Sequence, residues 1–417
     1  MVSEICGRKS YFKISKESVV MLVGVVGKPN VGKSTFFKAA TLAEVKIADY
    51  PFATIEPNHS VGFVKVACAE RHFNVKCNPR YGYCIDGTRF VPIDMIDVAG
   101  LVPGAHEGRG MGNQFLNDLN QADVLIHVID ASGTTNEKGE RTQGYDPAED
   151  VKFLEEELDY WYLGILKKGW AKFSRTLQHG EKEVAKELAE QMSAFSVKEE
   201  LMNEAVATLK LDTENVSLWT DEQMLALSSF LRKKTKPMII AANKMDKGDA
   251  EKNLAKLKER FPHLKIIPCS AESELALREA HRAGMISYIP GEKAFSVKDA
   301  ARMNDKQKAA LEFIHNSVLE KYGTTGVQDV LNEAVFGMLQ YMYIFPGGLN
   351  KLQDREGNVL PDCFLLPPKS TALDFAYRIH TDIGKAFIRA IDVKTRMVVG
   401  KEHLLKSGDV VEIITSR

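Results

Sequence analysis

The most constraining feature of the chain is the loop sequence GKPNVGKS at residues 27–34. It follows an apolar run at residues 19–26 and precedes residues 34–42, which are expected to form a helix, so a helix N-terminus would face a bound anion. The string fits the phosphate-loop pattern GxxxxGK[ST], in which backbone N–H groups surround the β-phosphate, Lys33 reaches the terminal phosphates and the Ser34 hydroxyl ligates Mg²⁺. The sequence therefore predicts a nucleotide site at Gly27, Pro29, Asn30, Val31, Gly32, Lys33, Ser34 and Thr35.

A second string, NKMD at residues 243–246, identifies the base. The Asp246 carboxylate can accept hydrogen bonds from N1–H and from the 2-amino group of guanine, whereas adenine offers neither donor. The string follows a buried-strand run at residues 237–242, and another strand at residues 264–268 precedes a Ser-Ala pair that can contact the guanine O6. The expected base-binding residues are Asn243, Lys244, Asp246, Ser270 and Ala271.

Between these two strings, a strand at residues 93–98 ends in the pattern DxxG. In such a loop the aspartate, here Asp97, holds Mg²⁺ through water, and the N–H of the glycine, here Gly100, senses the γ-phosphate. Four nucleotide motifs in the required order, each at the end of a strand, make chance an insufficient explanation.

These motifs lie within longer strings that resemble the Obg family of translation-factor-class GTPases, in its YchF-like (Obg-like) branch. The strings are GKPNVGKSTFFKAAT, ADYPFATIEPN, DVAGLVPGAHEGRGMGNQFL and NKMD. The resemblance implies an α/β fold, a P-loop GTPase domain with a mostly parallel sheet flanked by helices, that uses Mg²⁺ to hydrolyse GTP to GDP and phosphate. It also implies that Thr54 is the switch I threonine that closes on Mg²⁺; the alternative is a turn threonine beside Pro51. The implied catalytic residues are Lys33, Thr54 and Gly100, and the implied magnesium site consists of Ser34, Thr54 and Asp97.

The sequence divides into five expected segments. They are an N-terminal extension without an assigned role (1–20), the first part of the GTPase domain (21–135), a helical insertion (136–235), the second part of the GTPase domain with added helices (236–340) and a TGS-like β-grasp domain (341–417).

The insertion is expected to be helical. DPAE at residues 146–149 is a capping box with proline at the first helical position, and TDEQ at residues 220–223 caps a helix that ends near Leu231. Apolar residues with helical spacing mark the first helix and another between the two, namely Val151, Leu154, Leu158, Trp161, Ile165 and Leu166, then Val184, Leu188, Met192 and Phe195. The insertion is expected to form a helical arm, which either engages a partner or presents a solvated face. The basic residues available to a partner are Lys167, Lys168, Lys172 and Arg175.

After residue 270 a second helical block is expected, with Gly284 ending one helix and NDKQ at residues 304–307 capping another that runs to about Tyr322. The β-rich stretch from about Tyr341 resembles a TGS domain, through LDFAYRIH and GDVVEI. That resemblance implies a contact with RNA or the ribosome, and a plain packing module is the alternative.

Composition adds limits. The formal net charge is −1, so any RNA contact must be local. Six scattered cysteines favour a reducing cytoplasm without a disulfide-linked partner, and the absence of a long apolar run or a signal-peptide core predicts no membrane association. Four residues could form a tetrahedral zinc site, or else belong to a reduced hairpin without metal: Cys68, His72, Cys77 and Cys84.

Leu101 stands where fast relatives place a glutamine that orients the attacking water, so slow intrinsic hydrolysis is expected. His106 and Glu107 are candidates for positioning the water, and solvated loop residues are the alternative. The Asn30 carbonyl, with a backbone carbonyl near Thr54, is a candidate ligand for K⁺, by which related GTPases are activated. The alternative is an asparagine that only steadies the turn.

Three functional classes stay open: a GTP-hydrolysing switch on the ribosome or its factors, a nucleotide-gated RNA- or protein-binding module with incidental turnover, and an ATP-using enzyme. The third arises because relatives in the YchF-like branch that lose the NKxD pattern are thought to prefer ATP. This chain keeps Asn243, Lys244 and Asp246, which favours GTP.

Overall fold

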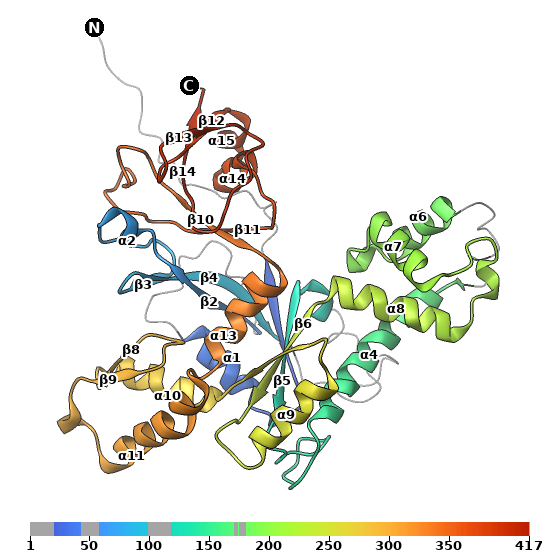
Figure 1. Cartoon of the computed structure of the whole chain (residues 1–417), viewed down its shortest axis with the longest axis horizontal. Coiled ribbons are helices and arrows are strands. Elements are labelled where there is room, and N and C mark those ends of the chain that lie inside the picture. The colour runs from blue at the N-terminus through green and yellow to red at the C-terminus, as the bar shows by residue number, and fades with distance from the viewer. Residues whose placement is uncertain (1–20, 43–57, 99–117, 171–173, 175–180, 417) are drawn as a thin grey trace.

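The computed structural model describes residues 21–42, 58–98, 118–170, 174 and 181–416, and a seven-stranded sheet lies at its centre (Figure 1). The strand order is β2-β4-β1-β5-β6-β7, with β3 beside β4. Strands β4, β1, β5, β6 and β7 run parallel, whereas β2 and β3 are antiparallel to β4. The bounds are β1 (Leu22–Val26), β2 (His59–Ala67), β3 (Tyr83–Ile85), β4 (Thr88–Asp97), β5 (Val124–Asp130), β6 (Met238–Asn243) and β7 (Lys265–Pro268). The arrangement confirms the predicted α/β fold with a mostly parallel sheet.

The central strands are apolar along their whole length because helices cover both faces of the sheet. Every residue of β5 and of β6 is buried. One face packs against α1 (Lys33–Thr41) and α13 (Val327–Asn332), and the other against α4 (Ala148–Lys167) and α9 (Ala250–Arg260). The sheet therefore holds the loops at its strand ends on a rigid frame.

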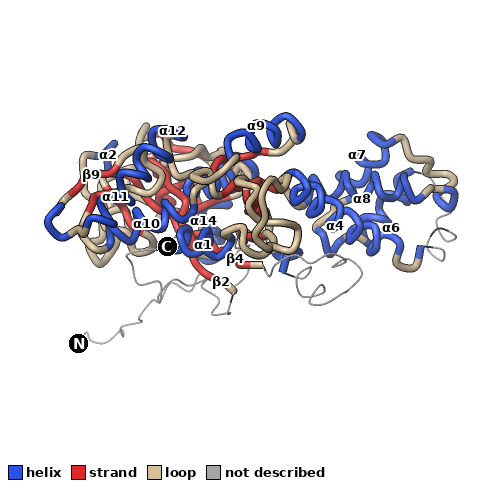
Figure 2. The backbone as a smooth tube through the Cα atoms, turned by 90° about the horizontal axis from the view of Figure 1, so that it is seen from below, coloured by secondary structure: helices blue, strands red, loops and turns tan. Residues whose placement is uncertain are grey.

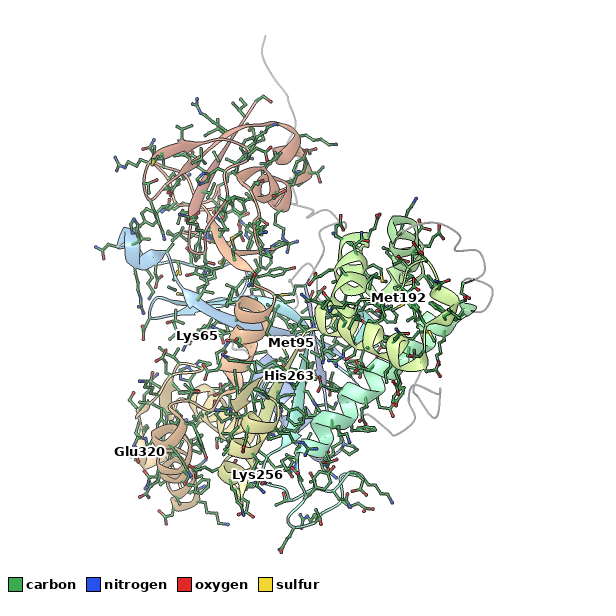
Figure 3. The ribbon with its side chains drawn as sticks, turned by 45° about the vertical axis from the view of Figure 1, so that its right-hand side comes forward. Lys65, Met95, Met192, Lys256, His263 and Glu320 are labelled. Carbon is green, nitrogen blue, oxygen red and sulfur yellow. The ribbon has the colours of Figure 1, made fainter. Side chains whose placement is uncertain are left out.

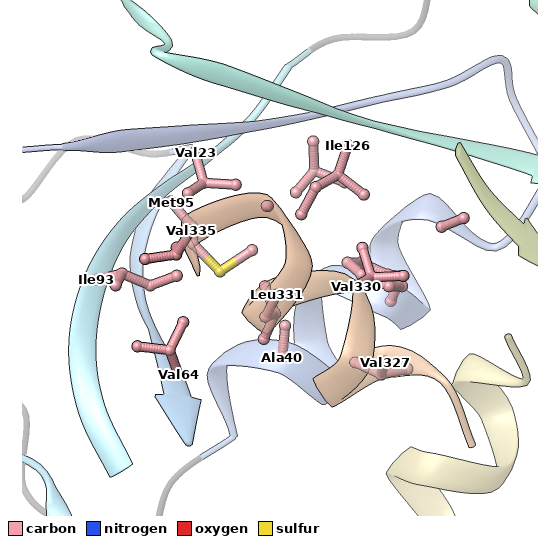
Figure 4. Packing of buried hydrophobic residues seen from close by; sticks show 14 of the residues in the cluster. Val23, Ala40, Val64, Ile93, Met95, Ile126, Val327, Val330, Leu331 and Val335 are labelled. Carbon is pink, nitrogen blue, oxygen red and sulfur yellow. The ribbon is translucent and has the colours of Figure 1, made fainter. Parts of the chain in front are cut away.

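Helix α13 comes from late in the sequence but completes the first core. Figure 4 shows its Leu331, with Val335 just beyond its end, between Ala40 of α1 and the strand residues Ile93 and Met95. All five side chains are buried, with at most 2% of their surface exposed. The segment after the last strand of the sheet is therefore part of the same folding unit as the first strand.

The insertion forms a helical arm with its own core, projecting from the sheet (Figures 1 and 2). Met192 lies inside it (Figure 3). The Thr220 capping box is confirmed at the start of α8 (Asp221–Thr235), which continues four residues past the predicted end. The sequence patterns did not predict α7 (Glu199–Leu209), which packs between α8 and α6 (Glu181–Gln191).

Buried Arg232 ties the arm to the sheet-covering helix. Its Nη2 donates to Glu155 at 3.0 Å and its Nε to Asp159 at 2.8 Å, joining α8 to α4. Near the start of α4, Ala148 N donates to the Asp146 carboxylate at 3.0 Å. The predicted capping box does not form, because Pro147 is the N-cap without a side-chain cap and Glu149 pairs with Arg260. None of the described helices is both long and apolar enough to cross a membrane.

The predicted block after residue 270 is helical. Its elements are α10 (Ala271–Arg282), the hairpin of β8 (Ile286–Tyr288) and β9 (Phe295–Val297), α11 (Asp305–Ile314) and α12 (Glu320–Tyr322). Gly284 follows α10 with a φ of 72°, and the Asn304 capping box begins α11, as expected. A π-helical segment, His315–Leu319, joins α11 to α12, so helix continues to Tyr322.

The C-terminal module is a five-stranded sheet in the order β11-β10-β14-β12-β13 with two short helices. Its elements are β10 (Met342–Pro346), β11 (Phe364–Leu366), α14 (Ala372–Ile379), α15 (Thr381–Lys385), β12 (Phe387–Asp392), β13 (Met397–Val399) and β14 (Val410–Thr415). A capping box of Thr371 and Asp374 begins α14. The module rests on the connection between β2 and β4, where Asn78 N donates to Val359 O at 3.0 Å.

One partly buried carboxylate beneath this module gives folding stability a specific pH dependence. Burial raises the pKa of Asp94 on β4 to about 7, and the positive charge of Arg378 on α14 opposes this shift only in part. The folded state therefore binds more protons than the unfolded state between about pH 4 and pH 7, so this group makes stability fall as pH rises through that window.

We expect Asp94→Asn to remove that decline and to raise the free energy of unfolding at pH 8, on the order of 1–3 kcal/mol for a partly exposed carboxylate. Chemical denaturation from pH 4 to pH 8 measures it. Asp86→Asn is the control because Asp86 lies in an exposed turn. A parallel pH profile for Asp94→Asn and the unmodified chain would contradict the assignment.

Candidate functional site

The phosphate loop connects β1 to α1, which begins at Lys33. Gly27 and Gly32 are required by space: a Cβ at Gly27 would overlap Val128 O, and one at Gly32 would overlap the Asn243 amide. Gly32 also has a φ of 93°, which favours glycine. The loop can therefore take this path only with glycine at these positions.

A pocket of about 370 Å³ opens over this loop. It contains most of the residues predicted for both motifs, although these motifs are far apart in the sequence. Four of the predicted residues, Gly27, Val31, Ser270 and Ala271, are buried and do not line the pocket. The lining residues are Lys28, Pro29, Asn30, Gly32, Lys33, Ser34, Thr35, Asn243, Lys244, Asp246, Lys247 and Glu272.

Asn243, at the end of β6, holds three loops together. Its Nδ2 donates to Val31 O at 2.9 Å, and its Oδ1 accepts from Ala271 N at 3.0 Å. The side chain is buried, so both ends of its amide are satisfied inside the protein. The phosphate loop and the Ser-Ala loop are thereby fixed in relation to the NKMD string.

The next residue, Lys244, lies along the phosphate loop. Its Nζ donates to Asn30 O at 2.8 Å and to the Asp130 carboxylate at 2.9 Å. Burial alone would raise the pKa of Asp130, but hydrogen bonds from Ser132 and Lys244 hold it below its usual value. Asp130 is therefore a charged anchor for the lysine.

Asp246 lines the pocket and is oriented by Ser270, whose Oγ donates to Asp246 Oδ1 at 2.8 Å. A second hydrogen bond joins Ser270 Oγ to Ser273 Oγ at 2.8 Å, at the start of α10, and here the Ser270 oxygen accepts. The carboxylate thus has a fixed position between the NKMD string and the Ser-Ala loop, where a base edge with two N–H donors would fit.

Lys33 forms an ion pair with Asp97, at the end of β4. The pair joins the phosphate loop to the predicted DxxG loop, and Ser34 is exposed beside it. The Asp97 carboxylate and the Ser34 hydroxyl are hard oxygen donors of the kind that Mg²⁺ prefers. The residues present therefore fit a magnesium ion bound with nucleotide phosphates.

Several predicted residues lie outside the described part of the chain. They are Thr54, Gly100, Leu101, His106 and Glu107 of the two switch segments, and Lys172 and Arg175 of the arm. Of the other basic arm residues, Lys167 forms an ion pair with Asp221 at 2.7 Å, within the arm itself.

The phosphate loop also contains a buried lysine, Lys28, that the motifs did not predict. The Nζ of Lys28 donates to Asp150 at 2.8 Å and to Thr135 O at 3.0 Å, and it lies 3.9 Å from the centre of the Tyr145 ring. Burial lowers the pKa of Lys28, opposed by the hydrogen bond and charge of Asp150. The pair connects the phosphate loop to the first turn of α4.

Two sequence signals could have pointed to these contacts. The first is Asp130, which ends a buried parallel strand at the sheet edge where ligands bind in α/β folds. The second is Lys28, because the phosphate-loop pattern does not require a lysine at this position, before Pro29. Asn30 also contacts the segment after β5, because its Nδ2 donates to Gly139 O at 2.9 Å.

The predicted cysteine cluster has a different fourth member. Cys68, Cys77 and Cys84 do come together, but the side chain that joins them is Glu70. His72 is exposed on the same short helix, where its ring contacts Phe73, so it does not face the thiols. Because Glu70 and His72 are two helical positions apart, they cannot point the same way.

Three family models match the chain. Residues 22–159 match "50S ribosome-binding GTPase", residues 241–347 match "Obg-like GTPase YGR210-like, G4 motif-containing domain" and residues 355–415 match "TGS domain". The first two ranges cover the strands that carry the phosphate loop, Asp97, Asn243 and Ser270.

Individual proteins match over nearly the whole chain. An uncharacterized GTP-binding protein of Methanocaldococcus jannaschii is 47% identical over 95% of this chain and 99% of its own length. The ribosome-binding ATPase YchF of Escherichia coli O157:H7 is 26% identical over 94% of this chain and 98% of its own length. The crystal structure of a GTP-binding protein from Pyrococcus horikoshii OT3 is similar with a TM-score of 0.73, at 37% identity, over 95% of this chain and all of that one.

The matches agree with the geometry in three respects: the phosphate loop, the NKMD string joined to it by Asn243, and the C-terminal β-grasp module. They also confirm the family expected from the sequence strings. The chain belongs to the Obg family of P-loop GTPases, in its YchF-like (Obg-like) branch, and carries a C-terminal TGS domain.

Proposed function

We propose that this protein binds GTP in the 370 Å³ pocket and hydrolyses it to GDP and phosphate, acting as a nucleotide switch on the ribosome or its factors. The observation that carries the proposal is the double hydrogen bond of Asn243, which joins the phosphate loop to the base-contacting loops. A pocket with both parts fixed suits a nucleotide bound at its base and its phosphates together.

The choice of guanine rests on Asp246. Its carboxylate is held by Ser270 at 2.8 Å and can accept two N–H donors, which guanine offers and adenine does not. Several relatives are named ATPases, including Obg-like ATPase 1 of Gallus gallus and the E. coli protein. ATP use is therefore the second candidate, and the intact NKMD string favours GTP over it.

The phosphate end supports hydrolysis at a slow intrinsic rate. Lys33 is free to exchange its ion pair with Asp97 for the terminal phosphates, where its charge would stabilise the charge that develops during transfer. Ser34 and Asp97 would hold Mg²⁺, which supplies further positive charge at the β- and γ-oxygens. Leu101 offers no hydrogen bond to water, so the chain's own contribution is chiefly binding and charge.

A ribosome or RNA partner is supported by the exposed edge of the TGS domain. There Ile388, Met397 and Val398 are 57%, 64% and 60% exposed, and the exposed basic side chains of Arg389 and Arg396 lie on and beside the same two strands. Exposed apolar side chains next to basic ones suit an RNA or protein surface. The name of the E. coli relative includes ribosome binding.

A nucleotide-gated binder with incidental turnover is the alternative within this proposal. Turnover measured with and without ribosomes separates the two, because a switch accelerates on its partner and a passive binder does not.

The proposed domain limits follow the sequence division at residues 135, 235 and 340. Matches to residues 22–159 and 241–347 support the interrupted GTPase domain. For the TGS domain, β10 begins at Met342 and already lies in the β-grasp sheet, ahead of the matched residues 355–415.

Asp246→Asn should abolish the preference for guanine, because the amide presents N–H where the base also donates. A pocket built for polar partners can reject a mismatch by about 10⁴ to 10⁵, and xanthosine triphosphate should then bind better than GTP. Competition binding measures the order. Asp249→Asn, an exposed residue at the start of α9, is the control; unchanged GTP preference in Asp246→Asn would contradict the base assignment.

Asn30 offers a test of K⁺. If its side-chain carbonyl and a backbone carbonyl near Thr54 bind K⁺, the turnover rate should be higher in KCl than in NaCl at equal ionic strength. The increase should not exceed the rate factor of about 10³ to 10⁵ that an arginine finger supplies in other GTPases. Asn30 has a φ of 64°, so Asn30→Ala adds backbone strain, whereas Asn30→Gly removes the carbonyl without it.

Both Asn30 variants should lose the K⁺ effect while still binding GTP. Equal rates of the unmodified protein in the two salts, alone and with ribosomes, would leave Asn30 as a residue that only steadies the turn through Gly139.

Reversing the charge of the TGS edge should weaken ribosome association. We expect Arg389→Glu with Arg396→Glu to bind ribosomal subunits less tightly and with a smaller salt dependence, by about one unit of the log–log slope per lost phosphate contact. Lys252→Glu with Lys256→Glu, an equal charge change on exposed positions of α9, is the control; Lys256 is labelled in Figure 3. Co-sedimentation measures both; equal binding by the two double variants would contradict a role for this edge.

A further inference from the structure

The connection between β2 and β4 contains a compact cluster of metal-ligand side chains. We call it the thiol cluster: Cys68, Glu70, Cys77 and Cys84. One ligand atom from each lies within 4.8 Å of all the others. The Sγ atoms of Cys68 and Cys77 are 3.6 Å apart, and Cys84 Sγ is 3.5 Å from Glu70 Oε1.

Hydrogen bonds from the backbone N–H groups of Cys77 and Cys68 hold this arrangement in place, and they leave the sulfur atoms available to a ligand. The other carboxylate oxygen of Glu70, Oε2, accepts from Cys77 N at 2.8 Å, and Cys68 N donates to Gly87 O at 2.9 Å. Cys84 lies on β3, paired with Arg89 of β4. Short helix α2 (Glu70–Phe73), a loop and a strand therefore bring four ligand groups to one point.

The spacing fits a tetrahedral metal ion. Four ligands at zinc–sulfur distances of about 2.3 Å lie roughly 3.8 Å from each other, close to the 3.6 Å between Cys68 and Cys77. Three thiolates and one carboxylate complete four-coordination, and thiolates select zinc-class ions over Mg²⁺ and Ca²⁺.

A second, independent observation is a buried arginine beside the thiols. Arg89 is fully buried, and among the described residues its Nε and Nη1 have no hydrogen-bond partner, while Nη2 donates to Leu360 O. Directly paired residues of antiparallel strands point to the same side of a sheet, so Arg89 lies on the side of Cys84.

An arginine stays charged in proteins, and a buried charge needs an anion. In the metal-free cluster the three neutral thiols provide none, and Glu70 supplies a single carboxylate. Asp362 is near, but burial raises the pKa of its carboxyl group, and the charges of Arg80 and Arg89 offset this only in part. With a divalent ion, three thiolates and a carboxylate carry a net charge of about −2, which compensates Arg89 at close range.

A metal binds the thiolate form of cysteine, so the three thiol protons would be released to solvent when the cation binds.

We propose that the thiol cluster binds one zinc-class divalent cation, with Cys68, Cys77, Cys84 and Glu70 as its ligands. The ion anchors the β2–β4 connection beneath the TGS domain, because Cys68 and Cys77 share a buried core with Phe345, Leu360 and Val410. The site is structural, since all four positions are filled by the protein.

The site stands apart from the nucleotide pocket. Arg89 and Asp97 lie near opposite ends of the ten-residue strand β4, which spans roughly 30 Å. GTP binding is therefore expected to be unaffected by cobalt or zinc at this cluster, and the proposal stands or falls separately from the proposed function.

Titration of the reduced, metal-free full-length protein with Co²⁺ tests the proposal. We expect one equivalent to bind, with the d–d absorption of tetrahedral cobalt and thiolate-to-cobalt charge-transfer bands, and one equivalent of Zn²⁺ to remove both. Zn²⁺ should also raise the melting temperature relative to protein in chelator. Absence of these bands would overturn the proposal, and it would equally fall if a Cys68–Cys77 disulfide formed in place of metal binding.

Variants assign the ligands. Cys84→Ser should weaken Co²⁺ binding by at least about 100-fold, more than the loss of an outer partner would. Glu70→Gln should keep the charge-transfer bands and change the d–d bands, since the thiolates remain. His72→Ala, on the same short helix but exposed, is the control and should bind Co²⁺ as the unmodified chain does. Loss of binding in His72→Ala with none in Glu70→Gln would overturn the ligand set.

Discussion

The nucleotide site depends on the buried side-chain amide of Asn243. One end of the amide accepts from the Ser-Ala loop and the other donates to the phosphate loop, so three strand ends are locked together. A buried amide with either partner missing would cost on the order of 1–3 kcal/mol. The pocket therefore keeps its shape through a bond pattern that few other side chains could reproduce.

The parallel sheet makes these bonds possible, because β1, β6 and β7 end at the same edge. The same edge connects the site to the rest of the molecule. The buried pair of Lys28 and Asp150 joins the phosphate loop to the first turn of α4, and Arg232 of α8 pairs with Glu155 and Asp159 in the middle of the same helix. Helix α4 therefore connects the nucleotide site to the arm.

Much of this was predictable from the sequence, for identifiable physical reasons. The phosphate loop and NKMD string impose fixed spacings, and three capping boxes, at Thr220, Asn304 and Thr371, mark helix starts locally. Helix α7 has buried apolar residues at helical spacing, Met202, Ala205 and Val206, so it could have been predicted; its place between α6 and α8 could not. The Lys28–Asp150 pair and the substitution of Glu70 for His72 arise from folding, which brings distant residues together or turns near neighbours apart.

Guanine recognition by Asp246 is the central claim, within a family whose members include named ATPases. The most direct measurement is the kcat/KM of the unmodified chain for GTP and for ATP, side by side, with Mg²⁺ and ribosomes present. A strong preference for GTP, approaching the roughly 10⁴-fold that hydrogen-bonded selection can give, is the predicted result. Equal or better use of ATP would contradict the claim.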